Sequence, residues 1–89
     1  MRGKMTEKKN RLFNAWKDKG RTTSDVEKHL LHHLDEVKEL IKNKGEHRFM
    51  ECADLDILVY LYFRYSDKNL GKHVRSRLNK FFKKLEEDP

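Results

Sequence analysis

Residues 24–41 read SDVEKHLLHHLDEVKELI, and this stretch carries the most regular hydrophobic pattern in the chain. Its apolar residues recur every three or four positions, as on one face of an α-helix; they are Val26, Leu30, Leu34, Val37 and Ile41, with Leu31 and Leu40 widening the stripe. Ser24 and Glu27 form a Ser-x-x-Glu sequence, which predicts a capping box at the start of this helix. Gly45 follows it, and we expect Gly45 to take the left-handed conformation that ends a helix.

Three other segments have helical patterns, over residues 6–18, 47–65 and 70–85. Gly20 is placed to stop the first of them. Residues 57–63 are rich in β-branched and aromatic side chains, but no second strand is available to pair with them, so we expect a helix there too. The sequence therefore predicts an all-α, four-helix bundle-like fold in one domain, residues 1–89, with 1–5 and 86–89 as loose ends.

The composition limits what this domain can bury and where it works. Hydrophobic residues make up 36% of the chain and charged residues 40%, so the core is small and a second copy would supply missing buried surface. We therefore expect a homodimer or homotetramer. The single cysteine, Cys52, excludes an internal disulfide and suits a reducing compartment. With no apolar run of membrane-spanning length and no secretory signal, the expected location is the cytoplasm, without a membrane partner.

Two acidic pairs, Glu36-x-x-Glu39 and Glu51-x-x-Asp54, lie in the second and third predicted helices. The i, i+3 spacing places both carboxylates of a pair on one helix face. If the two helices pack antiparallel, the four carboxylates converge, and their mutual repulsion is relieved by a divalent cation with a preference for oxygen ligands. A single such pair is most often a solvated surface. The second pair is less easily explained in that way, because it lies in the most apolar helix.

These residues resemble a known family. His33-Leu34-Asp35-Glu36-Val37-Lys38-Glu39-Leu40 and Glu51-Cys52-Ala53-Asp54-Leu55-Asp56-Ile57-Leu58 are similar to the two motif helices of MazG-like all-α nucleoside triphosphate pyrophosphohydrolases. Trp16 followed by Gly20 and Arg21 resembles the family's lead-in helix and turn, so that the resemblance covers residues 12–83. Two features depart from the family: the short loop, residues 40–50, and Asp35 where relatives commonly have Glu.

The resemblance implies hydrolysis of a nucleoside triphosphate to a monophosphate and pyrophosphate by water activated on Mg²⁺, or alternatively Mn²⁺. The implied metal ligands are Glu36, Glu39, Glu51 and Asp54. The implied catalytic residues are Asp35, Glu36 and Glu39, and the base that takes the proton from the water is Asp35 or one of the four metal-binding carboxylates.

Developing negative charge in such a reaction also needs cationic donors, and the fourth predicted helix offers them. Arg75, Asn79 and Lys83 fall on one line, with Lys72 on the same side, and they resemble the phosphate-contacting helix of the family with Lys and Arg exchanged. A solvated basic face is the alternative interpretation. Trp16 is the candidate for stacking on the base, although amphipathic spacing explains most aromatic residues as core.

Histidines form a rival set of ligands. His29, His33 and Glu36 have i, i+4, i+7 spacing, which could bind zinc, but ligands from one helix seldom close a tetrahedral site. Surface or interface positions are the usual explanation for such histidines.

Two other functional classes stay open. The net charge of +6, with basic residues concentrated in 2–21 and 68–84, suits a small nucleic-acid-binding module that contacts phosphates without reading sequence. A MazG-like subunit that has lost catalysis and kept the fold is the other alternative, for which the departure at Asp35 is the reason.

Overall fold

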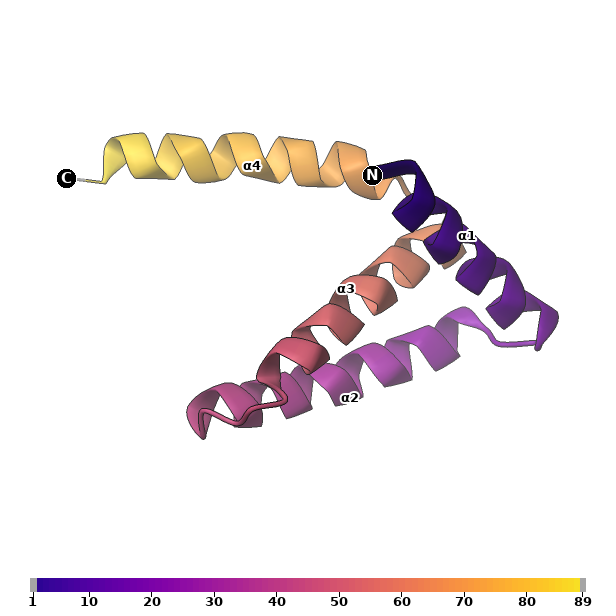
Figure 1. Ribbon diagram of the computed structural model, residues 1–89. Helices are drawn as coiled ribbons and strands as arrows, with labels where there is room; N and C mark the ends of the chain where they lie inside the picture. Colours follow the sequence, from indigo (N-terminus) through magenta and orange to yellow (C-terminus); the bar gives the residue numbers. More distant parts are fainter. Residues whose placement is uncertain (1, 89) are drawn as a thin grey trace.

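The structure is a computed structural model that describes residues 2–88, and it consists of four α-helices (Figure 1). They are α1 (Arg2–Asp18), α2 (Thr23–Lys42), α3 (Arg48–Tyr65) and α4 (Leu70–Glu87). Within this described range no strand is present, which confirms the all-α prediction, including a helix over 57–63. Met1 and Pro89, which end the predicted loose segments 1–5 and 86–89, lie outside the described residues.

The N-terminal cap of α2 lies two residues before the predicted one. Thr22, in extended backbone, accepts a hydrogen bond from the Asp25 amide at its Oγ1, and the Asp25 carboxylate accepts one from the Thr22 amide at 2.7 Å. This is a capping box made by Thr22 and Asp25, so the prediction of Ser24 and Glu27 was wrong. The reason is that Ser24 is already inside the helix, while Glu27 instead accepts a hydrogen bond from the Tyr62 hydroxyl at 2.7 Å.

The C-terminal end of α2 also differs in detail from the prediction. Lys44, not Gly45, takes the left-handed conformation, with φ of +56°. The Gly45 amide donates to the Leu40 carbonyl at 2.8 Å, and a Cβ added at this glycine would lie 2.5 Å from Leu40 Cδ2. Gly45 therefore serves close packing of the loop on α2 rather than a positive φ. Gly20, predicted to stop the first helix, does take positive φ, at +76°.

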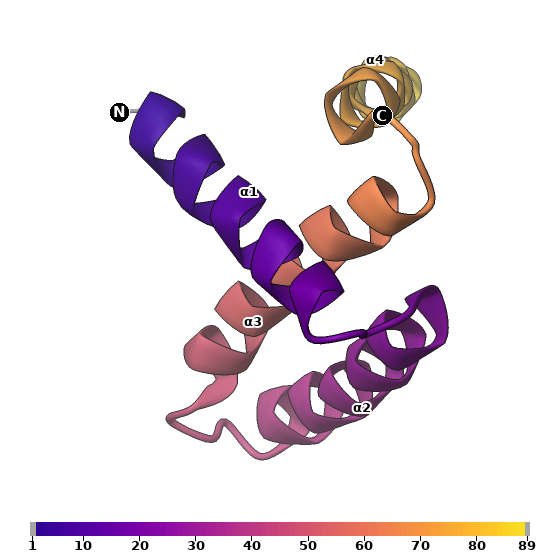
Figure 2. The same ribbon diagram turned by 90° about the vertical axis from the view of Figure 1, so that its right-hand side faces the viewer.

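Three helices make the core. α2 and α3 form an antiparallel hairpin, and α1 crosses α3 (Figure 2). Buried side chains from all three helices form one cluster, to which half-buried aromatic side chains add; the buried members are Phe13, Val26, Leu58 and Leu61. The hydrophobic effect of this burial fixes the hairpin, and the hairpin brings the two acidic motifs face to face.

Helix α4 stands apart. In the part of the chain that the structure describes, α4 runs away from the end of α3 and does not pack along α1, α2 or α3 (Figures 1 and 2). Near the N-terminal end of α4, the ring of His73 packs edge-on against Phe63 of α3, with 5.3 Å between the ring centroids. The radius of gyration is 15.5 Å, against about 12 Å for a compact chain of this length. The predicted four-helix bundle is thus only partly formed within one chain.

Candidate metal centre

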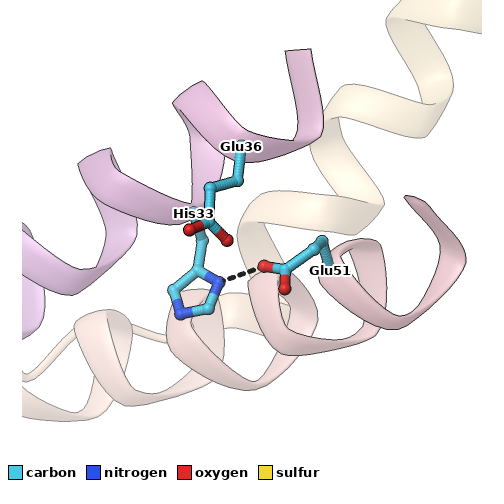
Figure 3. A group of neighbouring side chains, drawn as sticks. All are labelled: His33, Glu36 and Glu51. Carbon is cyan, nitrogen blue, oxygen red and sulfur yellow. Dashed lines mark hydrogen bonds and ion pairs between the residues drawn. The ribbon is translucent and has the colours of Figure 1, made fainter. Parts of the chain in front are cut away.

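Glu36 of α2 and Glu51 of α3 approach one another across the hairpin, and the imidazole of His33 lies beside both carboxylates (Figure 3). One ligand atom from each of these three side chains lies within 4.8 Å of the others. Because two come from α2 and one from α3, the grouping depends on the hairpin and not on one helix alone. Two carboxylates and an imidazole are a donor set that suits a divalent cation.

Hydrogen bonds hold the cluster in place. His33 Nδ1 lies 2.5 Å from Glu51 Oε2, and both side chains are about one fifth exposed. Asp54 follows one turn after Glu51 and brings an oxygen to 3.9 Å from the same nitrogen. His32 Nε2 lies 2.8 Å from Glu36 Oε1. The hydrogen bond from His33 keeps the pKa of the Glu51 carboxyl below its usual value, with a smaller contribution from Glu36, so Glu51 stays ionised and able to act as a ligand.

The structure brings together some of the predicted site residues and leaves others outside. Glu36 and Glu51 lie close together at the hairpin, and Asp54 approaches the same group through His33 Nδ1, while the role of all three as metal ligands stays a prediction. Glu39 and Asp35 are exposed on α2 and line an open surface recess beside Glu36. Among the described residues, the group of close ligand atoms contains neither of these two carboxylates. Their roles as ligand and base stay predictions.

Trp16 lies near this cluster. Its ring meets that of His29 edge-on at 5.6 Å between centroids, and the Arg21 guanidinium lies 4.7 Å from its centroid. His29 is one helical turn before His33 and two turns before Glu36 on α2. The indole and the Arg21 guanidinium therefore lie toward the N-terminal end of α2 from the candidate metal centre.

The predicted phosphate-binding residues lie elsewhere in the single chain. Their helix, α4, begins after the last turn of α3, whereas Glu51 is in its first turn, about 20 Å along the helix axis. All four side chains are exposed on this helix; they are Lys72, Arg75, Asn79 and Lys83. Within one chain these residues do not reach the acidic cluster.

The sequence did not predict that His33 lies in the same cluster as Glu36 and Glu51. Its spacing to Glu36 marked it as part of a separate, one-helix set with His29. The structure merges the two sets, because His33 bonds Glu51 across the hairpin while His29 packs on Trp16. The His33-x-x-Glu36 spacing was the available signal, but the cross-helix partner depends on the register of α2 against α3.

No family model, curated protein or solved structure matched this chain in the comparisons made. The resemblance to MazG-like proteins therefore stays a prediction. Within residues 2–88, no helix combines the length and apolar character needed to cross a membrane.

Proposed function

We propose that the α2–α3 hairpin holds a divalent cation and hydrolyses nucleoside triphosphates to nucleoside monophosphate and pyrophosphate. The observation that carries this proposal is the convergence of Glu36, Glu51 and His33 from two helices, with Asp54 beside them. It is also the activity implied by the resemblance to MazG-like pyrophosphohydrolases. Assembly as a homodimer or homotetramer, and work in the cytoplasm where these substrates occur, are parts of the same proposal.

The donor atoms fit Mg²⁺ or Mn²⁺. Carboxylate oxygens are the preferred ligands of both ions, and a separation of 4.8 Å or less lets small side-chain rotations direct them to a common centre. Glu36, Glu51 and Asp54 would hold the ion, with His33 as a further ligand or as the hydrogen-bond partner that orients Glu51. When bound, the cation would neutralise triphosphate oxygens and acidify a water molecule.

The remaining residues supply orientation and proton transfer. Asp35 and Glu39 present exposed carboxylates next to Glu36, and either can accept the proton of the attacking water. The indole of Trp16 offers a face for the nucleobase, and Arg21 beside it offers a positive charge to the phosphates. Together they would set the nucleotide along α2, with its phosphates toward the carboxylates.

A pyrophosphate-release assay tests the proposal. Purified protein is incubated with each nucleoside triphosphate and Mg²⁺ or Mn²⁺, and pyrophosphate and monophosphate are quantified. We expect Glu51→Gln to lose at least about 100-fold in rate while keeping its helical circular dichroism, since it removes a ligand charge. Glu46→Gln is the matched control, because Glu46 lies in the loop outside the cluster and its loss should leave the rate unchanged. Absence of pyrophosphate with every nucleotide and both metals contradicts the proposal.

One observation favours a second candidate, the binding of nucleic acid. Helix α4 carries six Lys and Arg residues, is exposed over residues 71–87, and stands away from the other three helices. Such a helix can contact phosphates with an affinity that falls as salt rises. Tight, salt-dependent binding of duplex DNA that survives Glu51→Gln, combined with no turnover, would favour this candidate over the enzyme.

A further inference from the structure

Helix α4 presents an apolar stripe that no other part of residues 2–88 covers. Val74, Leu78, Phe81 and Leu85 recur along one face at helical spacing, and each is between 46% and 68% exposed. Phe82 widens the stripe and is 62% exposed. A helix with this pattern folds stably when its apolar face is buried. The stripe therefore indicates a surface that is covered by something else.

The exposed area of the chain is large enough to build a stable interface. The solvent-accessible surface is 7,656 Å². A compact monomer of 10.8 kDa exposes about 5,500 Å². The difference exceeds the roughly 800 Å² that each partner buries in a typical stable complex.

Charge complementarity points to the partner. Helix α4 holds six Lys or Arg residues and two Glu residues, whereas residues 23–65, which span α2 and α3, hold nine Asp or Glu and six Lys or Arg. Two copies of α4 would therefore repel one another, while α4 and the hairpin attract. The hairpin also has exposed apolar side chains to meet the stripe; they are Leu31, Leu34, Ile41, Phe49 and Met50.

We propose that a second copy of this chain covers α4, so that the α4 of each protomer packs its apolar stripe on the α2–α3 hairpin of the other. A reciprocal exchange of this kind closes with two-fold symmetry and leaves no α4 unpartnered. In such a pair Arg75, Arg77 and Lys84, which flank the stripe on its two sides, approach the acidic hairpin of the partner. The pairing itself does not depend on the proposed catalytic function.

An anionic membrane surface fits these features less well than a second copy. A membrane could accept the basic, amphipathic α4. It would repel the acidic hairpin and leave the apolar side chains of that hairpin in water. A second copy covers both apolar surfaces and pairs both charges at once.

The mass of the full-length protein in solution tests the proposal. Light scattering on a sizing column is expected to give twice 10.8 kDa at micromolar concentration. Leu78→Glu places a charge in the stripe and should weaken dimerisation at least about 100-fold, with helical circular dichroism retained. Ser76→Glu is the matched control, because Ser76 is on the opposite side of α4 and should leave the mass unchanged.

The receiving surface is located by cross-linking. Protein labelled with heavy nitrogen is mixed with unlabelled protein and treated with a zero-length carboxylate–amine reagent. Cross-links between chains should join an α4 lysine beside the stripe, Lys84, to hairpin carboxylates such as Glu39. Cross-links between chains that join only α4 to α4 overturn the proposed arrangement.

The other outcomes are equally decisive. A tetramer that Leu78→Glu dissociates supports the covering of α4 by further copies. A wild-type mass of 10.8 kDa at about 100 µM overturns the proposal. If that monomer then binds vesicles with anionic lipid, or DNA, and loses this binding in Leu78→Glu, the stripe belongs to that ligand instead.

Discussion

The imidazole of His33 lies against the carboxylate of Glu51, with Nδ1 and Oε2 2.5 Å apart, and this contact joins the middle of α2 to the first turn of α3. Both side chains are mostly shielded from water, so the hydrogen bond also fixes how the two acidic motifs face one another. The same nitrogen cannot donate a proton to Glu51 and offer its lone pair to a cation. Cation binding and the His33–Glu51 bond are therefore linked.

This linkage predicts the effect of removing the imidazole. His33→Ala should weaken Mn²⁺ binding by about 10- to 100-fold, because it removes either a ligand or the group that orients Glu51. Isothermal titration calorimetry with Mn²⁺ alone measures the change. His47→Ala serves as the control, since His47 is exposed at the start of α3 and outside the cluster. Unchanged Mn²⁺ affinity in His33→Ala would mean that the cluster is a hydrogen-bonded junction between helices and not a metal centre.

Trp16 gives an optical test of the proposed nucleotide site. It is the only tryptophan in the sequence, so its fluorescence reports on one position. We expect a non-hydrolysable nucleoside triphosphate analogue with Mn²⁺ to change the emission, and we expect Trp16→Leu to raise KM by about tenfold with kcat little altered, since stacking on a base contributes about 1–3 kcal/mol.

Inorganic triphosphate with Mn²⁺ is the matched ligand for this experiment, because it carries the phosphates without a base. If it changes the emission as much as the nucleotide does, the indole responds to phosphate or metal binding and does not stack on the base. A Trp16→Leu variant with unaltered KM would lead to the same conclusion.

The cap of α2 predicts a stability that depends on pH. Hydrogen bonds from the backbone amide and hydroxyl of Thr22 hold the pKa of the Asp25 carboxyl below its usual value. Folding therefore favours ionised Asp25, and this stabilisation is present above the ordinary Asp pKa of about 3.9 and is lost as the pH falls below it. Asp25→Asn should lower Tm at pH 7, and the difference from wild type should shrink toward pH 3.

Two alanine variants separate the observed cap from the one predicted by the sequence. Thr22→Ala should cost about 1 kcal/mol in the free energy of unfolding, which is the usual loss for an N-cap side chain. Ser24→Ala should cost much less, because Ser24 lies inside α2 and its side chain does not cap the helix. Chemical denaturation of both variants at pH 7 measures the two costs. Equal costs would argue against the Thr22–Asp25 capping box.

Local patterns in the sequence were enough to predict the helices and the approach of the two acidic motifs. The three- and four-residue spacing of apolar side chains located all four helices, because that spacing is set by the helix itself. Antiparallel packing of α2 on α3 followed from the short loop between them.

The sequence did not predict two kinds of feature. One is the choice between neighbouring residues that could each cap a helix, and the other is the register of one helix against another. Thr22 and Ser24 both have an acidic residue three positions later, so both fit the capping-box pattern. In the structure Thr22 has the extended backbone of an N-cap residue, and Ser24 is inside the helix. The contact of His33 with Glu51 depends on the register in which α2 packs against α3, and no local sequence pattern specifies that register. The apolar stripe of α4 predicted a face buried in the bundle, whereas in the structure its side chains are exposed.

If α4 packs on the hairpin of a second copy and that hairpin hydrolyses nucleotides, two inactive variants should rescue one another. Glu51→Gln damages the hairpin of one chain. The double variant Arg75→Ala/Lys84→Ala removes two charges that flank the stripe of the other chain's α4 and leaves its hairpin unchanged. In a mixed dimer, one site combines an intact hairpin with an intact α4 from the partner. Mixing equal amounts after subunit exchange should restore about a quarter of the wild-type rate, since random pairing makes one site in four intact.

A second pair of variants makes the rescue specific to the exchange of α4. Glu51→Gln mixed with Glu36→Gln leaves every hairpin damaged, so no combination of chains contains an intact site and the rate should stay at that of the single variants. Mass spectrometry of the mixtures shows whether mixed dimers have formed. If they form and the mixture of Glu51→Gln with Arg75→Ala/Lys84→Ala still shows no gain, the basic residues of α4 do not act on the partner's site. The phosphates would then have to be bound by cations of the same chain, and Arg21, which lies against Trp16, is a candidate.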